Sequence, residues 1–207
     1  YAFSLNPDSA VVNVGDTVAP FTGTFTADLR PVGFTLGLTV VEGANVVRVD
    51  SLGRLIVLGR GEALVRVRPQ SVALPVDTIE RTVRVTAVVP SIALPAQPPE
   101  DTLYSLLETK TLQATAQTLD SVPIPGVPIA WRVVSGANFV TLLDAAAGTV
   151  RADSNGVAVL EATVDAAHAR RTVVVRQRPT AMALTLTQAR LRSVGQTMTV
   201  GVTLRDA

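Results

Sequence analysis

Cysteine is absent from this 207-residue chain, and histidine, lysine and tryptophan occur once each, as His168, Lys110 and Trp131. Without cysteine there is no disulfide and no thiol chemistry, and one histidine excludes zinc sites built from several histidines. An excess of one charge is also lacking, because 18 basic and 17 acidic residues leave a net charge of +1. Charge alone therefore does not favour nucleic acid or an anionic membrane as a partner.

Long hydrophobic runs are missing as well. The longest uncharged stretch, residues 85–99, is broken by four prolines and is shorter than the ~20 apolar residues that a membrane-spanning helix requires. The numbering begins at Tyr1 without a methionine or a leader, and Met198 to Ala207 has the pattern of a strand that has barely finished. We therefore expect a mature or excised piece of a larger protein, with any membrane attachment outside these residues.

β-branched residues are abundant. The 34 valines and 24 threonines suit the pleated, half-buried surface of a sheet. A hydrophobic content of 47% and a mean hydropathy of +0.36 allow a buried core and exclude wholesale disorder. Aromatic residues make up only 4%, so the core must be mainly aliphatic. The composition predicts an all-β protein.

The sequence contains an internal repeat of about ninety residues. Three pairs of segments align: 34–47 with 127–140, 61–67 with 156–162, and 81–85 with 171–175. In the first pair alternate positions are apolar, which is typical of a strand with one face on a core, and both segments then reach Gly-Ala-Asn, a turn. A third copy starts late in the chain, where Val14-Gly-Asp-Thr17 recurs as Val194-Gly-Gln-Thr197.

These alignments predict domains at 1–88 and 89–178, followed by a partial third repeat, its first strands only, at 179–207. One proline stands at each junction, Pro90 and Pro179, and restricts the backbone more than a Gly/Ser linker would. We therefore expect a semi-rigid rod of independently folding domains, each large enough to form a core without disulfides.

Local patterns predict strands almost throughout, separated by closely spaced turn signals. Glu100 to Lys110 is predicted to be a short helical turn or an irregular connection, and Asp165 to Arg170 a short turn. Trp131 is predicted to be the single large core residue of the second domain. Leu38 takes its place in the first domain, where we expect compensating volume from phenylalanines, namely Phe21, Phe25 and Phe34.

The sequence offers little chemistry. His168 is predicted to be a solvated residue at the tip of the last hairpin of the second domain, and there is no Gly-x-Ser-x-Gly elbow, so no triad is expected. The glycines of Leu58-Gly-Arg-Gly-Glu62 lack the lysine and hydroxyl residue of a phosphate loop and predict a hairpin turn. We therefore predict no catalytic and no cofactor-binding residues.

Asp153-Ser-Asn-Gly156 looks like half of a calcium loop. It lacks the later bidentate glutamate, and a turn stabilised by Asx hydrogen bonds explains the same residues. We predict no metal site, with calcium as the open alternative.

Arginines give the one charge asymmetry, with seven arginines against two aspartates from Asp165 onward. Alternation is expected to place Arg176 and Arg178 on one strand face. Either this is a solvated sheet face at the junction or it contacts an acidic partner, a glycan or a neighbouring subunit. The cluster comprises Arg170, Arg171, Arg176, Arg178, Arg190 and Arg192.

The chain resembles bacterial immunoglobulin-like domains, the tandem β-sandwiches of invasin- and intimin-type adhesins. The similarity lies in Val14 to Thr17, in the strand that carries Trp131 and in Gly148 to Leu160; the segments from Asp50 to Val57 and from Leu58 to Val67 are more similar to a second bacterial group. The chain departs from this pattern by lacking a tryptophan in the first domain and by a proline-bearing insertion from Pro95 to Leu107.

The resemblance implies tandem Ig-like β-sandwiches with the start of a third, extracellular, cell-surface or periplasmic placement, and a spacer, stalk or adhesive role without enzymatic activity. The main alternative is a subunit of an extracellular fibre or envelope complex, in which residues 179–207 complete a neighbour's sheet by strand addition. Met198 to Leu204 has the alternating pattern that such a strand needs. An enzyme would require a missing domain. A protein or glycan partner, or neighbouring subunits, remain open.

Overall fold

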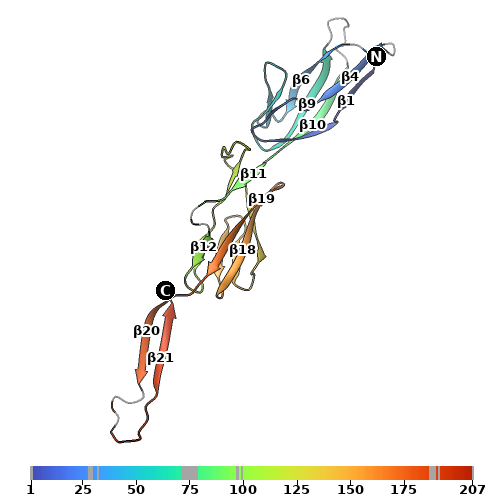
Figure 1. The fold of residues 1–207 in the computed structure, drawn as a ribbon. Helices are drawn as coiled ribbons and strands as arrows, with labels where there is room; N and C mark the ends of the chain where they lie inside the picture. The colour runs from blue at the N-terminus through green and yellow to red at the C-terminus, as the bar shows by residue number, and fades with distance from the viewer. Residues whose placement is uncertain are drawn as a thin grey trace. The chain divides into compact units, whose positions relative to one another are not determined.

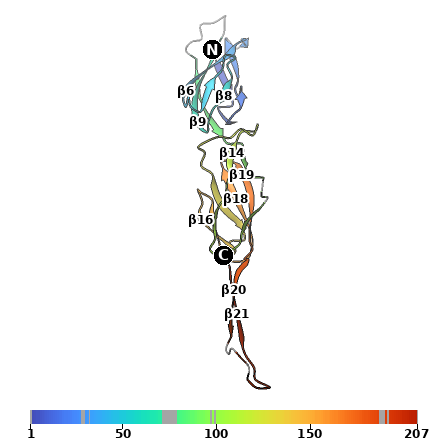
Figure 2. The ribbon, with the colours of Figure 1, turned by 90° about the vertical axis from the view of Figure 1, so that its left-hand side faces the viewer.

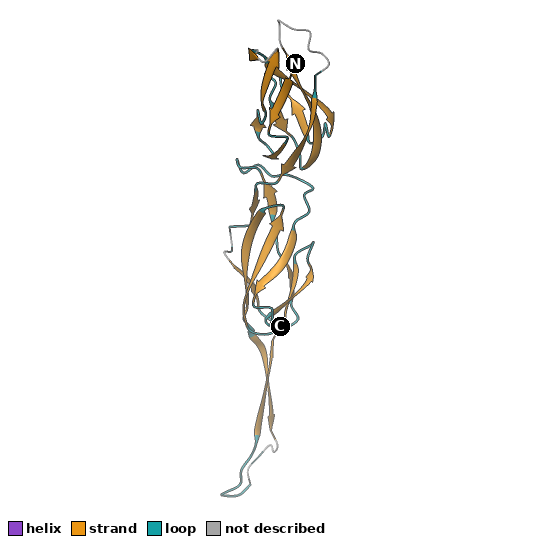
Figure 3. Ribbon diagram, turned by 90° about the vertical axis from the view of Figure 1, so that its right-hand side faces the viewer, coloured by secondary structure: helices purple, strands orange, loops and turns teal. Residues whose placement is uncertain are grey.

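The computed structural model describes residues 2–27, 30–31, 33–70, 79–96, 98, 100–186, 190 and 192–206. Every regular element in these ranges is a β-strand (Figure 3), so the predicted all-β class is confirmed. No helix in the described part is long and apolar enough to span a membrane. The chain forms two compact units: the first comprises residues 1–93, 115–128 and 164–168, and the second residues 94–114, 129–163 and 169–207.

The first domain is a sandwich whose strands form three sheets (Figure 1). In spatial order the sheets are β1 (Ala2–Asn6), β4 (Thr22–Ala27) and β5 (Arg30–Pro31); β2 (Ser9–Asn13), β10 (Arg81–Val88), β9 (Gly61–Gln70) and β6 (Thr35–Glu42); and β3 (Thr17–Val18), β8 (Leu55–Val57) and β7 (Val47–Val49). Consecutive strands β1 and β2 belong to different sheets, and β2 runs parallel to β10. The chain changes sheet at Asn6-Pro7, which has a cis peptide bond.

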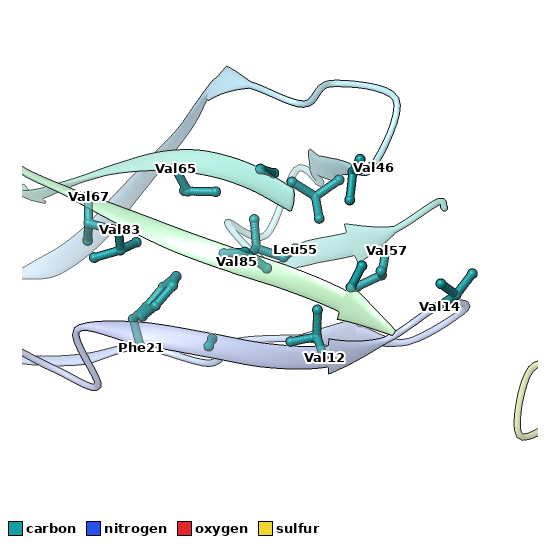
Figure 4. Packing of buried hydrophobic residues seen from close by; sticks show 14 of the residues in the cluster. Val12, Val14, Phe21, Val46, Leu55, Val57, Val65, Val67, Val83 and Val85 are labelled. Atoms are coloured by element: carbon teal, nitrogen blue, oxygen red, sulfur yellow. The ribbon is translucent and has the colours of Figure 1, made fainter. Parts of the chain in front are cut away.

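The core of this sandwich is made of valine, alanine, leucine and phenylalanine from all three sheets. Val65 and Val67 on β9 and Val83 and Val85 on β10 alternate with more exposed neighbours, as the period of a strand requires. Figure 4 shows these side chains gathered between the strands together with Leu55 of β8. The valine-rich alternation seen in the sequence is therefore the inner face of a sheet.

The first domain has no tryptophan, and phenylalanines fill its core instead, as predicted. Phe21 and Phe25 are buried. Phe34 packs edge-on against Phe25, with ring centroids 6.1 Å apart, and against Phe3 at 6.2 Å. Leu38 is partly buried against the same core.

The following strands repeat this plan. In spatial order the sheets are β11 (Ser91–Ala93) and β14 (Thr115–Gln117); β12 (Glu100–Leu103), β19 (Ala167–Val175), β18 (Gly156–Val164) and β15 (Ala130–Ser135); and β13 (Thr109–Thr111), β17 (Thr149–Ala152) and β16 (Val140–Asp144). β12 runs parallel to β19 as β2 does to β10. The repeat found in the sequence is thus a repeat of strand topology, and the chain consists of tandem immunoglobulin-like β-sandwiches.

Glu100 to Lys110 contains more structure than predicted. Residues 100–103 form β12, and 109–111 form β13. A turn separates them, in which Leu107 has a φ of +64° and the Glu108 carboxylate accepts the backbone N–H groups of Tyr104 and Ser105. The predicted insertion from Pro95 to Leu107 thus includes the strand that pairs with β19, and the helical alternative is wrong because the polar groups here are satisfied by pairing and capping.

Trp131 is buried in the second unit, in agreement with the prediction. Its backbone N–H donates to the Ala145 carbonyl at 2.8 Å. Gly148, with a φ of +71°, lies beside the indole, where an added Cβ would come 2.6 Å from Trp131 Nε1. A glycine is therefore needed at the turn that closes over the ring.

β20 (Pro179–Leu186) and β21 (Val200–Asp206) form an antiparallel two-stranded sheet (Figures 1 and 2). The strand expected from Met198 to Leu204 is therefore present, although it begins at Val200. Val194 to Thr197, the third copy of the Val-Gly-x-Thr segment, is not in a strand.

Candidate interaction surfaces

The predicted basic cluster does not form one surface. Within the second unit Arg171 is buried, and Arg170 is paired with an acidic side chain. Arg171 is buried, and its Nε donates to Asp101 Oδ2 at 2.6 Å while Nη1 donates to the Pro95 carbonyl at 2.9 Å. Its Nη2 donates to the Pro98 carbonyl. Arg171 thereby fixes the proline-bearing segment to β19, a structural role that the sequence did not reveal.

Asp101 receives a second cation, since Lys110 Nζ lies 2.8 Å from its Oδ1. Burial alone would raise the pKa of Asp101, but hydrogen bonds from Arg171 and Lys110 outweigh it and hold the pKa below its usual value. The only lysine of the chain is thus part of a structural ion-pair network.

Arg170 is paired as well. Its Nε donates to Glu161 Oε1 at 2.9 Å, and Arg132 Nε donates to Glu161 Oε2 at 2.8 Å. These hydrogen bonds, from Arg170 first and Arg132 second, lower the pKa of Glu161. The three side chains form a cross-strand network over β15, β18 and β19.

Arg176 and Arg178 follow β19 and do not lie within a strand, which corrects the predicted placement. Their backbone N–H groups still donate to the carbonyls of Leu103 and Tyr104, at 2.9 and 3.0 Å. The Arg178 guanidinium stacks on the Tyr104 ring, 4.3 Å from its centroid. Both side chains are exposed, and neither lies on the strand face on which the sequence placed them.

The residues that resemble half of a calcium loop are hydrogen-bonded to other side chains of the chain. Asp153 accepts from Arg151 Nε at 2.9 Å and from the Thr141 hydroxyl, and these bonds, Thr141 first, lower its pKa. The Asn155 side chain is hydrogen-bonded to Gln177 through both of its polar atoms. Within the described ranges no group of three acidic or histidine side chains is placed to hold a metal ion.

The other candidates of the sequence lie apart from one another. His168 is exposed on β19, just after the turn at Asp165. Gly59 lies between β8 and β9 and Gly61 begins β9, and these two strands belong to different sheets. The predicted hairpin at Leu58 to Glu62 is therefore wrong, because the chain crosses here from one layer of the sandwich to the other.

Arg60 and Asp165 form an ion pair in the first compact unit that the sequence did not indicate. Arg60 Nη2 donates to Asp165 Oδ1 at 2.7 Å, and Nε to the same oxygen at 2.9 Å. Asp165 Oδ2 accepts the backbone N–H of Val89 at 2.9 Å. These contacts, that of Arg60 first, hold the pKa of Asp165 below its usual value despite partial burial. Asp165 itself has a φ of +50°.

An open strand edge lies on the first sandwich. β2 pairs with β10 only from Arg84 onward, so Arg81–Val83 have no strand on that side within the described residues. A hollow of about 400 Å³, open to solvent, lies here between β10 and β1 and is lined by Phe3, Leu5 and Val83 among others. An extended segment could pair with this edge.

No family model matches the chain, and no curated protein matches it. Among solved structures, it is similar to domains 4 and 5 of the S-layer protein SbsC, with 14% identity, 85% of this chain and 98% of that chain covered, and a TM-score of 0.35.

Two adhesion proteins give comparable values. A C-terminal 282-residue fragment of intimin, solved with the intimin-binding domain of its translocated receptor, has 13% identity, covers 92% of this chain and 67% of its own, and has a TM-score of 0.44. Chicken VE-cadherin EC1-2 has 11% identity, coverages of 83% and 98%, and a TM-score of 0.33. The strand topology identifies the chain as an all-β protein of tandem Ig-like sandwiches.

Proposed function

We propose that this chain is a non-enzymatic structural module of a secreted or cell-surface bacterial protein, in which Ig-like domains at 1–88 and 89–178 act as a spacer or adhesive stalk. The observation that carries the proposal is the recurrence of one strand order, β2-β10-β9-β6 and then β12-β19-β18-β15, each with its parallel first pair. A tandem repeat multiplies length without adding chemistry, as a spacer requires.

The use of the charged side chains supports the same proposal. Asp101, Glu161, Asp165 and Asp153 all accept hydrogen bonds from nearby arginines or backbone groups, which holds strands and turns in place. Charges so engaged stabilise a scaffold and leave little for acid-base chemistry. The invasin- or intimin-type resemblance of the Trp131 strand and of Gly148 to Leu160 agrees with this role and with a protein or glycan partner.

Surface placement is tested on intact cells of the source organism. Antibodies raised against residues 1–207 should bind unpermeabilised cells or the secreted fraction, and brief protease treatment of intact cells should remove the signal. Signal confined to the cytoplasm, with an intact cytoplasmic marker as the control, would contradict the proposal.

The alternative is a subunit of an extracellular fibre or envelope complex joined by strand addition. It is favoured by the open edge at Arg81–Val83 and by β20–β21, which has no third strand among the described residues. Mass photometry of the 207-residue chain separates the two. Oligomers that grow with concentration favour the fibre, whereas a monomer at every concentration removes it.

A further inference from the structure

The turn between β12 and β13 has a counterpart in the first repeat, between β2 and β3. The Leu107 N–H donates to the Ala152 carbonyl at 2.8 Å, and the Gly15 N–H donates to the Val57 carbonyl at 3.0 Å. In both turns the carbonyl of the following residue accepts a hydrogen bond back from the same partner, at 2.9 Å. Gly15 and Leu107 therefore occupy equivalent positions of one hydrogen-bonded turn.

This position requires a left-handed backbone. The φ angle is +96° at Gly15 and +64° at Leu107, and Gly195 in the third Val-Gly-x-Thr segment has a φ of +85°. Glycine adopts this conformation without strain, whereas a bulky side chain is disfavoured in it. Two of the three copies thus carry the residue that the backbone favours, and the second copy carries one that it disfavours.

The Leu107 side chain gains little from packing. It is 69% exposed, so most of its apolar surface remains in water. An exposed leucine alone is common, but this one combines exposure with a strained backbone, and such strain is concentrated at functional sites. Within the described residues, packing therefore gives no reason for a leucine at this position.

The side chains around Leu107 resemble those of a binding site. Tyr104 and Leu106 of the same turn are each 39% exposed. The Arg178 guanidinium lies over the Tyr104 ring, 4.3 Å from its centroid. Arg176 and Arg178 are exposed, and among the described residues neither forms an ion pair. The turn therefore presents apolar and aromatic side chains beside two cations that no described carboxylate neutralises.

Hydrogen bonds hold this turn in one conformation. The Glu108 carboxylate accepts the backbone N–H groups of Tyr104 and Ser105, and the Arg178 N–H donates to the Tyr104 carbonyl at 3.0 Å. A pre-organised site loses less conformational entropy on binding than a flexible one. Tyrosine and arginine are also among the residues that contribute most to binding at protein interfaces. We call residues 104–107 together with Arg176 and Arg178 the Leu107 surface.

We propose that the Leu107 surface binds a partner protein that offers an apolar pocket to Leu107 and carboxylates to Arg176 and Arg178. The pocket removes the leucine from water, and carboxylates are the natural partners of guanidinium groups. An anionic membrane fits less well, because two arginines are fewer than the about four to eight basic residues that mark such sites. The inference rests on the adhesive role within the proposed function and names the chemistry of its partner.

The first experiment asks whether Leu107 serves the fold. Leu107→Gly relieves the strain, so we expect the melting temperature of the second unit to rise by about 2–4 °C, after the greater entropy of glycine in the unfolded chain offsets part of the gain. Leu106→Gly is the matched control, because the Leu106 backbone is not left-handed, and it should lower the melting temperature. Fluorescence of Trp131, the only tryptophan, follows the second unit. A fall for Leu107→Gly like that of the control would overturn the proposal.

The second experiment selects random peptides displayed on phage for binding to the purified 207-residue chain. We expect the enriched peptides to combine apolar with acidic residues and to bind more weakly as salt is added. Their affinity should fall at least about tenfold with Leu107→Gly and with Arg178→Glu. Arg176→Glu is a second charge reversal, outside the stack on Tyr104, in case Arg178→Glu does not fold. Arg48→Glu, at an exposed position of β7, is the matched control and should leave the affinity unchanged.

Several results of this selection would overturn the proposal. Enrichment of no peptide, or of peptides that bind Leu107→Gly and the charge reversals as tightly as the native chain, would mean that the Leu107 surface is not a site. Apolar peptides without acidic residues would mean that the arginines take no part in recognition.

Two further measurements test the other occupants. Cosedimentation with phosphatidylglycerol vesicles that Leu107→Gly abolishes would assign the surface to a membrane, and self-association in mass photometry that the same variant abolishes would assign it to a second copy. Either result would overturn the choice of an acidic partner protein. All of these measurements use the purified chain, so their failure is distinguishable from a failure of the proposed surface placement on cells.

Discussion

Arg171 and Asp101, seventy positions apart, form an ion pair in which Nε lies 2.6 Å from Oδ2 and both side chains are largely buried. The same guanidinium also binds the carbonyls of Pro95 and Pro98. Arg171→Ala would remove one of the two cations that pair with Asp101, the other being Lys110, and would take this donor from two carbonyls. We expect a loss of about 3–5 kcal/mol in the free energy of unfolding, measured by urea titration. Arg176→Ala, at an exposed position, should change it by less than about 0.5 kcal/mol.

Trp131→Ala should cost about 3–5 kcal/mol, because it removes the largest side chain from the core of the second unit. Trp131→Phe should recover much of this loss, since it retains an aromatic ring there. Chemical denaturation followed by circular dichroism measures both. A loss below about 1 kcal/mol for Trp131→Ala would mean that the indole does not contribute to the core.

Gly43 and Gly136 occupy equivalent turns of the two repeats, with φ of +78° and +76°. A Cβ at Gly43 would lie 2.6 Å from the Glu62 carbonyl, and one at Gly136 would meet the carbonyl of Val157. Gly126 has a similar φ of +72° with nothing within 4 Å, so Gly126→Ala isolates the conformational cost of about 1–2 kcal/mol. Gly43→Ala and Gly136→Ala should each lower the melting temperature further than Gly126→Ala does.

Stability should fall in acid partly through Asp165. Its pKa is lower in the folded chain than in the unfolded chain, because Arg60 and the Val89 N–H stabilise the carboxylate. Such a group adds stability that is fully present above its unfolded pKa of about 4 and is lost as the pH falls through the folded pKa. Asp165→Asn should therefore reduce stability at pH 7 and flatten its decline between about pH 5 and pH 2. Asp120→Asn, at an exposed turn, is the matched control; an unchanged pH profile for Asp165→Asn would contradict this role.

Removal of calcium should leave the protein unchanged. The Asp153 carboxylate is engaged by Arg151 and Thr141, and Asn155 by Gln177. A cation at this turn would have to displace an arginine that already neutralises the carboxylate. The melting temperature should be the same in EDTA and in calcium, and a clear increase with calcium would reveal a site there.

Much of the fold could be read from the sequence because strand periodicity and turn chemistry are local. The alternation before Gly43 and Gly136 located β6 and β15, and the burial of Trp131 followed from its place on the inner face. Ion pairs could not be read in this way. Arg60 lies 105 positions from Asp165, and no local pattern distinguishes these charges from solvated ones.

The turn predicted at Leu58 to Glu62 also shows that local sequence does not reveal which strands pair. Its glycines correctly indicated a change of direction, but whether the chain returns in the same sheet or crosses to the other one depends on which strands become neighbours. The answer required the pairing of β8 with β7 and of β9 with β10 and β6.

By itself the sequence determined that this protein is all-β, that it repeats, and that its core is aliphatic, because each property depends on composition and short-range spacing. Tertiary structure alone decided that β2 and β12 run parallel to the last strand of their repeats and that Arg171 is buried and Arg178 exposed. It also decided that Leu107 lies exposed with a left-handed backbone. These features depend on contacts between residues distant in the chain, and no periodicity within a strand specifies its partner.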